Sequence, residues 1–345
     1  MVDYQADGAE MKAYVSQRYP YLDGNTEYVV KNTDYNFRPG LTWPRRTEGL
    51  SFRVLPEGAI FADKGSAAFS SSDKPGEIMA LASYFNSRAF GILAGVVVAR
   101  LELAQSFEVG LINLITVPRR MRTEKAAALA KRIHDIQRRA RVEEPTSRIR
   151  RMPFLVRESN DSNLASGFEA IEAERRRMNE DYQETRRIID NLVFEAYEFP
   201  EQDRGALSVT EENGKGVFAT NIDRQVHTHR LTGYILGCAL GRWDVRYATG
   251  KRDLPELPDP FDPLPVCPPG MLTGDDELPL TEAPEGYPLN VPADGILVDD
   301  PGHDRDVLSR MRSALDLMFE DEAAAEREAC ELLDESDLRS YFRKT

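Results

Sequence analysis

Residues 42–47 have the sequence Thr-Trp-Pro-Arg-Arg-Thr, and two β-type runs follow them at residues 50–55 and 59–63. The tripeptide Pro56-Glu57-Gly58 separates the two runs and is typical of a tight turn. The sequence therefore predicts a β-hairpin that carries basic and aromatic side chains.

Helical periodicity dominates the rest of the chain. Apolar stripes with 3-4-3-4 spacing predict long helices at residues 123–140 and 167–197, with Thr123 as the N-cap of the first. Such stripes are typical of a packed helix hairpin or a short coiled coil. The other predicted elements are a short helix that begins near residue 9 and ends before Pro20, helices at residues 76–90, 228–242, 304–319 and 322–333, and strands at residues 27–31 and 107–117.

These elements indicate an α+β protein. It would contain a small mixed sheet, long helices and an extended acidic, Pro-rich segment that ends in helices. We divide the chain into four segments: an α+β domain at residues 1–118, a helical region at 119–252, the extended segment at 253–303 and C-terminal helices at 304–345.

Composition favours a folded cytoplasmic protein. Of the 345 residues, 41% are hydrophobic and 30% are charged, which is typical of a chain with a core and not of a disordered one. No apolar run is long enough to span a bilayer, and the N-terminus lacks the features of a secretory signal. Three distant cysteines, Cys238, Cys267 and Cys330, cannot form a disulfide framework. We expect no membrane partner.

The net charge of −14 is unevenly distributed along the chain. Residues 119–157 contain 13 Lys or Arg and 4 Asp or Glu, whereas residues 253–337 contain 4 Arg and 24 Asp or Glu. Salt screens charges beyond about 10 Å, so a partner responds to the local charge. The basic middle can face phosphate while the acidic C-terminal third faces water or another protein.

Several segments resemble the C-terminal region of large adenine-specific DNA methyltransferases. These are the type IIG restriction–modification enzymes and the methyltransferases of BREX-type phage-defence systems. The resemblance extends over nearly the whole chain. It is carried by residues 32–47, 52–56, 61–65, 84–90, 107–110, 117–118, 241–246, 248–250, 258–261, 269–272, 294–303 and 338–344.

In that family, this region follows the methyltransferase domain and carries a target-recognition domain with helical spacers. The resemblance therefore implies target recognition at residues 1–118 and a spacer at 119–252. It implies three kinds of partner: double-stranded DNA, a methyltransferase domain or subunit, and other defence proteins. The chain would be a separately encoded subunit, a decayed gene product or an excised piece of a longer enzyme.

Catalytic motifs of the family do not occur in the sequence. There is no glycine-rich turn for S-adenosylmethionine and no Asn/Asp-Pro-Pro-aromatic tetrapeptide for a flipped base. His227 and His229 lack neighbouring ligands at metal-binding spacing, so a surface pair is the favoured interpretation. We predict no catalytic residue, no metal site and no cofactor in this chain, with S-adenosylmethionine expected on the missing catalytic domain.

The candidate DNA-binding residues are basic or aromatic side chains in three places. They are Trp43, Arg45, Arg46, Arg53 and Lys64 on the hairpin, Arg119, Arg120 and Arg122 before the first long helix, and Arg148, Arg150 and Arg151 in a Pro-flanked loop. Arginine can contact phosphates or guanine edges, and a tryptophan can wedge between bases.

Each candidate group also has a structural interpretation. The hairpin cations can form an ordinary solvated face, and Trp43 can be buried beneath the hairpin. Lys131, Arg132, Arg138 and Arg139 on the first long helix either follow phosphates or lie on a solvated helix face. The segment 242–244 is expected to cap and pack rather than bind.

Two functions from different classes follow. The first is a sequence-specific DNA-recognition module of an adenine-specific methyltransferase. The alternative is a protein-interaction subunit of a defence complex that docks through its helices and acidic tail. Whether the chain is itself an enzyme stays open.

Overall fold

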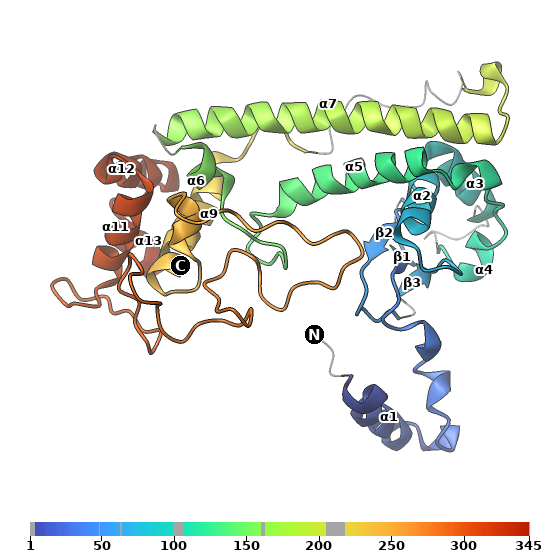
Figure 1. The fold of residues 1–345 in the computed structure, drawn as a ribbon, viewed down its shortest axis with the longest axis horizontal. Helices are drawn as coiled ribbons and strands as arrows, with labels where there is room; N and C mark the ends of the chain where they lie inside the picture. Colours follow the sequence, from blue (N-terminus) through green and yellow to red (C-terminus); the bar gives the residue numbers. More distant parts are fainter. Residues whose placement is uncertain are drawn as a thin grey trace. The chain divides into compact units, whose positions relative to one another are not determined.

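The computed structural model describes residues 4–47, 49–62, 64–98, 106–159, 163–204 and 218–344 (Figure 1). They form long helices and one small three-stranded sheet, which confirms the predicted α+β class. The chain forms two compact units: unit 1 contains residues 1–130 and 260–263, and unit 2 contains 131–259 and 264–345. The extended segment and the C-terminal helices therefore belong largely to the same unit as most of the helical region.

Unit 1 contains the sheet. Strand β1 (Gly40–Pro44) lies between β2 (Arg53–Leu55) and β3 (Gly65–Ala68), and both pairings are antiparallel. The expected mixed sheet is thus corrected to an antiparallel one. Alternation along β1 buries Leu41 and Trp43 on one face, whereas Thr42 lies on the other face opposite Arg53.

The predicted hairpin is wrong in its second strand. Residues 59–62 form no strand, and Asp63 lies outside the described residues. The turn itself is present, since the Ala59 amide donates to the Pro56 carbonyl at 3.3 Å. The chain then pairs with Phe37, whose amide donates to the Ala59 carbonyl at 2.8 Å. The strand that pairs with β1 on the side away from β2 is β3, which begins only at Gly65.

Several short elements of unit 1 also differ from the predictions. Residues 27–31 contain the end of a 3₁₀ helix at Thr26–Tyr28 instead of a strand, and the predicted strand at 107–117 contains helix α4 (Val109–Ile112). The predicted helix at 76–90 is two helices, α2 (Pro75–Phe85) and α3 (Arg88–Val98). The remaining elements are α1 (Gln5–Arg18) and 3₁₀ helices at Pro20–Leu22, Thr33–Tyr35 and Arg119–Met121.

The long helices match their predictions well. The Thr123 hydroxyl caps α5 (Glu124–Arg141) by accepting a hydrogen bond from the Ala126 amide at 3.1 Å. Helix α5 begins in unit 1 and ends in unit 2. Within unit 2, Ile136 of α5 packs on Met178 and Tyr182 of α7. Unit 2 also contains α6 (Phe154–Glu158), α7 (Leu164–Ala196), α9 (Arg224–Ala239), α10 (Val245–Ala248), α11 (Val307–Met318), α12 (Glu322–Leu333) and α13 (Leu338–Lys344).

The main core of unit 2 lies among α6, α7, α9, α11 and α12. Apolar residues at helical spacing on α9 and α11 are buried, namely Leu231, Ile235, Cys238, Leu308, Met311, Leu315 and Met318. No single helix among the described residues has the length and apolar composition of a membrane span. Helices α2 and α3 have that length and composition only when they are taken together, and the pair is bent by 68°.

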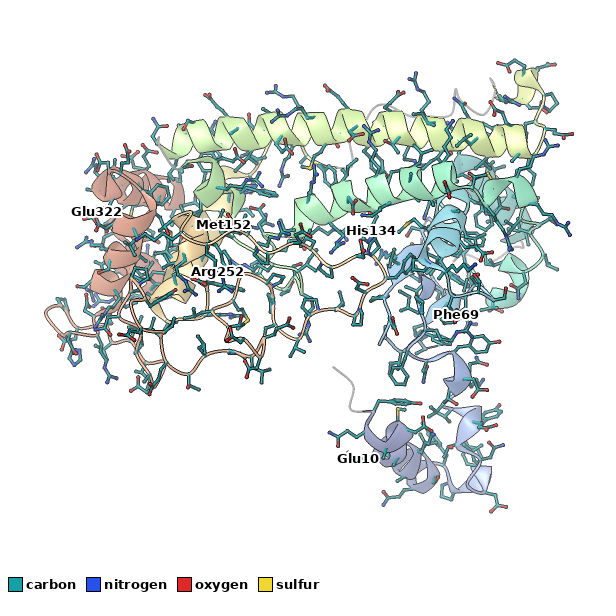
Figure 2. The ribbon with its side chains drawn as sticks, in the orientation of Figure 1. Glu10, Phe69, His134, Met152, Arg252 and Glu322 are labelled. Atoms are coloured by element: carbon teal, nitrogen blue, oxygen red, sulfur yellow. The ribbon has the colours of Figure 1, made fainter. Side chains whose placement is uncertain are left out.

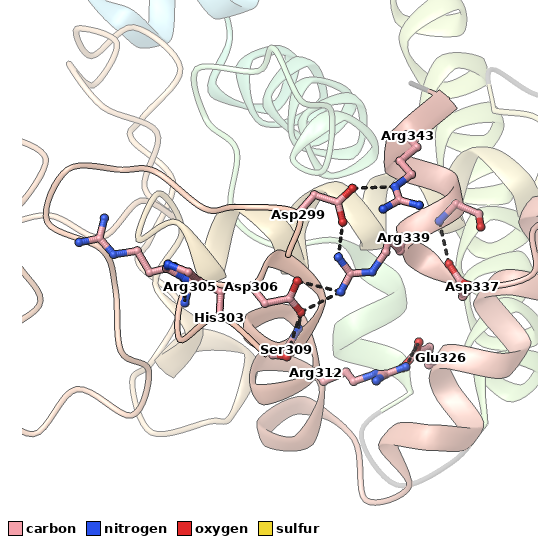
Figure 3. Close-up of polar contacts among 11 residues, drawn as sticks. Asp299, His303, Arg305, Asp306, Ser309, Arg312, Glu326, Asp337, Arg339 and Arg343 are labelled. Carbon is pink, nitrogen blue, oxygen red and sulfur yellow. Dashed lines mark hydrogen bonds and ion pairs between the residues drawn. The ribbon is translucent and has the colours of Figure 1, made fainter. Parts of the chain in front are cut away.

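Ion pairs connect the extended segment to the C-terminal helices (Figure 3). Arg339 of α13 binds Asp299 and donates to both carboxylate oxygens of Asp306, at 2.8 and 2.9 Å. Arg343 donates to Asp299 at 2.6 Å. Asp306 in turn caps α11. The segments 294–303 and 338–344, both of which carry the family resemblance, therefore hold each other in place.

Candidate functional site

Three candidate cations are exposed on or beside the sheet of unit 1: Arg53 on β2, Arg46 just after β1 and Lys64 just before β3. Arg53 lies on β2 opposite Thr42, on the face of β1 away from Leu41. The Arg45 amide donates to the Lys64 carbonyl at 3.1 Å, so Lys64 lies beside the end of β1. Among the described residues, none of the three side chains forms an ion pair. Of the candidates predicted on the hairpin, these three are therefore available to an anionic partner.

The interpretation of Trp43 as a DNA wedge is wrong. Only 2% of its surface is exposed, its Nε1 donates to the Phe107 carbonyl at 2.9 Å, and its ring lies 4.9 Å from that of Phe52. Large aromatic side chains gain most by such burial. The neighbouring Arg45 is half-buried and donates to Glu108 at 2.6 Å, so it is partly neutralised.

The cations before α5 form a second exposed group in unit 1. Arg119 and Arg120 lie in a 3₁₀ helix that buried Met121 anchors. Arg122 is exposed but donates to Glu77 at 2.7 Å. This ion pair joins the end of the 3₁₀ helix to α2, so Arg122 has a structural role.

The candidates in the Pro-flanked loop belong to unit 2. Arg148 is exposed and donates to the Val266 carbonyl at 3.0 Å. Arg150 is only 5% exposed, and its guanidinium lies 4.4 Å from the centre of the Trp243 ring. Burial, and then the charge of Arg242, lowers the pKa of Arg150 to about 10. The DNA-contact prediction for Arg150 is therefore wrong, because its cation is buried against an indole.

Arg151 is half-buried and faces a cleft of unit 2. Burial, and then the charges of Arg138 and Arg157, lowers the pKa of Arg151. Among the cations of α5, Lys131 and Arg132 are each paired with a carboxylate. The predicted phosphate-following surface of α5 is thus partly neutralised within the protein.

Several segments that carry the family resemblance hold the fold together. In unit 1, the Asn86 side chain accepts a hydrogen bond from the Phe52 amide at 2.8 Å and donates to the Phe52 carbonyl at 3.0 Å. The Phe52 ring stacks on Phe85 at 4.6 Å and contacts Phe90 edge-on at 5.8 Å. The segments 52–56 and 84–90 therefore form one aromatic core.

In unit 2, the segments 241–246 and 269–272 are joined through Gly270. Its amide donates to the Arg150 carbonyl at 2.9 Å, and its carbonyl accepts from the Asp244 amide at 3.0 Å. Trp243 forms a bridge with Met271, and Asp244 caps α10. The prediction that residues 242–244 cap and pack is confirmed for Trp243 and Asp244.

A buried charge network is the feature that sequence reasoning missed. Glu143 is fully buried and binds Arg230, and it lies 3.4 Å from His227 Nδ1 and 3.9 Å from Arg175. It also accepts a hydrogen bond from the Phe154 amide at 3.2 Å. Burial by itself raises the pKa of Glu143. His227, Arg230 and the Phe154 amide lower it by more, so the pKa lies below its ordinary value. The partners come from α7 and α9, far away in sequence, so no local pattern indicated them.

The two histidines considered as a metal pair have different partners. His227 faces Glu143, whereas Nδ1 of His229 lies 2.7 Å from the Tyr341 hydroxyl. Within the described ranges, no three His, Cys, Asp or Glu side chains come together in a metal-binding arrangement.

The two units differ sharply in charge. Unit 1 contains 15 Lys or Arg and 15 Asp or Glu, so the whole net charge of −14 belongs to unit 2. A polyanion is therefore repelled by the average charge of unit 2 and not by that of unit 1.

Comparison with known proteins gives no family for this chain. No protein-family model matches it, and no curated protein is similar to it in sequence. The resemblance to adenine-specific methyltransferases therefore stays a prediction from the motif segments.

Proposed function

We propose that this chain is a DNA-recognition module, the target-recognition part of an adenine-specific DNA methyltransferase in restriction–modification or phage defence. The observation that carries the proposal is the exposed set Arg46, Arg53 and Lys64 on or beside the sheet of unit 1. None of these three is used in an ion pair among the described residues, in contrast to Arg45 and Arg122.

The spacing of Arg53 and Lys64 suits a nucleic acid. Arg53 lies opposite Thr42, and Lys64 lies beside Arg45. Thr42 and Arg45 are three residues apart, so Arg53 and Lys64 are separated by about 10 Å along the strand direction. They also lie on opposite sides of β1, which adds about 10 Å across the sheet. The separation of Arg53 and Lys64 is comparable to that between phosphates of a duplex.

Methyl transfer would be the task of a partner. S-adenosylmethionine would bind a methyltransferase domain or subunit outside this chain, and this chain would select the site on DNA. A role in DNA modification or defence would place the protein in the cytoplasm.

Fluorescence anisotropy with a labelled duplex tests the proposal. The full chain is expected to bind at about 50 mM salt and to lose affinity steeply towards 200 mM, because each neutralised phosphate releases counterions. Failure to bind any duplex at low salt, alone or with a partner methyltransferase, would contradict it.

A second candidate function is a protein-interaction subunit. It is favoured by the extended segment 253–303, which contains 12 Asp or Glu and no Lys or Arg. The same segment exposes five apolar side chains: Leu264, Val266, Leu278, Leu280 and Ile296. Acidic and apolar groups together suit a basic, apolar protein groove. Size-exclusion chromatography with co-expressed defence proteins tests this function, and a monomer that captures none of them contradicts it.

A further inference from the structure

A cleft of about 520 Å³ lies in unit 2, whereas the residues on which the proposed function depends belong to unit 1. Its walls are the part of α5 from Lys131 onward, the beginning of α6, the first half of α7 and residues 254–259. The Arg138 guanidinium donates to the Pro258 carbonyl at 2.7 Å and so fixes residues 254–259 to α5. Met152, which Figure 2 labels, is one of the apolar residues that line it.

Cations gather in this cleft. Lys131, Arg138, Arg139, Arg151 and Arg157 all line it. Arg139 and Arg151 form no ion pair with any residue in the described ranges, and Nε of Arg151 is buried without a hydrogen-bond partner there. Folding thus brings the half-buried guanidinium of Arg151 close to those of Arg138 and Arg157, an arrangement that an anion would stabilise.

The other lining residues are four carboxylates, Asp135, Glu174, Glu256 and Asp259, and an apolar surface. Val142, Met152, Phe154, Met178, Leu254 and Leu257 contribute to it. The Arg157 guanidinium lies 4.9 Å from the centre of the Phe154 ring, so cationic and apolar surfaces adjoin. The volume lies within the range of about 300–1,000 Å³ that is usual for sites of small organic ligands. Inorganic phosphate alone would leave most of such a space empty.

We propose that this cleft binds a nucleoside phosphate. Its phosphate would lie against Arg151 and Arg139, since planar guanidinium groups match phosphate oxygens in pairs. Its planar base would pack on the apolar side chains around Met152 and Leu257. The ligand is thus a free small molecule, and the site is independent of DNA recognition by unit 1.

A duplex does not suit the same cleft. Glu256 and Asp259 line it from residues 254–259, and the Asp259 side chain is 78% exposed. Successive phosphates of a duplex laid over the opening would meet these carboxylates and the acidic charge of unit 2. A single phosphate at Arg151 would meet the charge of Glu256, which acts on that guanidinium, but not the row of repulsive contacts that a duplex would make.

Isothermal titration of the full chain with adenosine 5′-monophosphate tests the proposal. Saturable one-to-one binding is expected, with adenosine and inorganic phosphate each binding at least about tenfold more weakly. Arg151→Gln and Arg139→Gln should each weaken binding by about tenfold or more, the usual value of a charge-assisted hydrogen bond. Arg141→Gln is the matched control, because Arg141 is exposed on the same helix but does not line the cleft.

Three results would overturn the proposal. They are the absence of saturable nucleotide binding, wild-type binding by both Arg139→Gln and Arg151→Gln, and displacement of the nucleotide by a short duplex. Arg139 is exposed, so its variant is expected to fold even if Arg151→Gln does not. Binding of DNA by unit 1 can fail while nucleotide binding persists, and the reverse is equally possible, so the two proposals are tested separately.

Discussion

Glu143→Ala is expected to destabilise unit 2 strongly. The Glu143 side chain is fully buried, whereas the side chains of its partners Arg230 and Arg175 are 20% and 16% exposed. Removing the carboxylate leaves two largely desolvated cations and the Phe154 amide without their shared acceptor. Breaking a buried ion pair in this way costs about 3–5 kcal/mol. With a urea m-value of about 1–3 kcal/mol/M, the unfolding midpoint should fall by about 1 M or more.

Urea titration followed by circular dichroism and by tryptophan fluorescence measures this change. Trp43 lies in unit 1 and Trp243 in unit 2, so single-tryptophan variants separate the two unfolding transitions. Glu144→Ala is the matched control, because it removes a carboxylate of the same type from a half-buried neighbour without a side-chain ion pair among the described residues. A loss below about 1 kcal/mol for Glu143→Ala, or an equal loss for the control, would refute the reasoning.

The same variant gives a pH dependence with a definite sign. Because the pKa of Glu143 in the folded protein lies below its ordinary value of 4.5, the charge contributes stability that is complete above that value. The contribution is lost as the pH falls through the lowered pKa. The difference in unfolding free energy between wild type and Glu143→Ala should therefore be constant near pH 7 and decrease below about pH 4. A difference that grows on acidification would contradict this sign.

Three further substitutions test the packing. Gly270→Ala would place a Cβ 2.3 Å from the backbone oxygen of Arg151, so thermal unfolding should show a loss of about 1–3 kcal/mol or more. Asn86→Ala removes both side-chain hydrogen bonds to Phe52 and should cost about 1–3 kcal/mol in urea titration, with no change in the stability of unit 2. Trp43→Phe should lower stability but leave duplex affinity within about twofold in anisotropy titration, since a buried ring does not contact DNA.

Helices were predictable where one stripe of apolar residues indicated both the helical periodicity and the face that is buried. The stripe that includes Met311 and Leu315 gave α11 and its inward residues, and Thr123 gave the start of α5. In these elements, local propensity and packing favour the same conformation. The α+β class followed from them.

Strand pairing was less predictable because it depends on distant partners. Residues 59–62 have strand-like composition, but their backbone pairs with Phe37 and β1 pairs with β3. The segment 107–117 is rich in β-branched residues and nevertheless contains α4. Its Phe107 carbonyl accepts the hydrogen bond of the buried Trp43 indole, a contact that no local pattern specifies.

The candidate site was predictable only where exposure follows from the local sequence. A basic residue in a polar stretch is exposed by default, and Arg46, Arg53 and Lys64 follow that expectation. Arg150 does not, because Trp243, more than ninety residues later, covers it. Glu143 belonged to a basic segment and was passed over, since its partners come from α7 and α9.

The salt dependence of DNA binding tests the central claim most directly. We would compare wild type with the triple variant Arg46→Gln, Arg53→Gln and Lys64→Gln. The control is a triple Gln variant with the same charge change at three exposed arginines of α7, namely Arg176, Arg177 and Arg187. The account predicts that the slope of log K against log salt becomes shallower by about 0.9 for each lost phosphate contact, or about 2–3 in all, only in the unit 1 variant. Equal slopes for the wild type and both variants would contradict it.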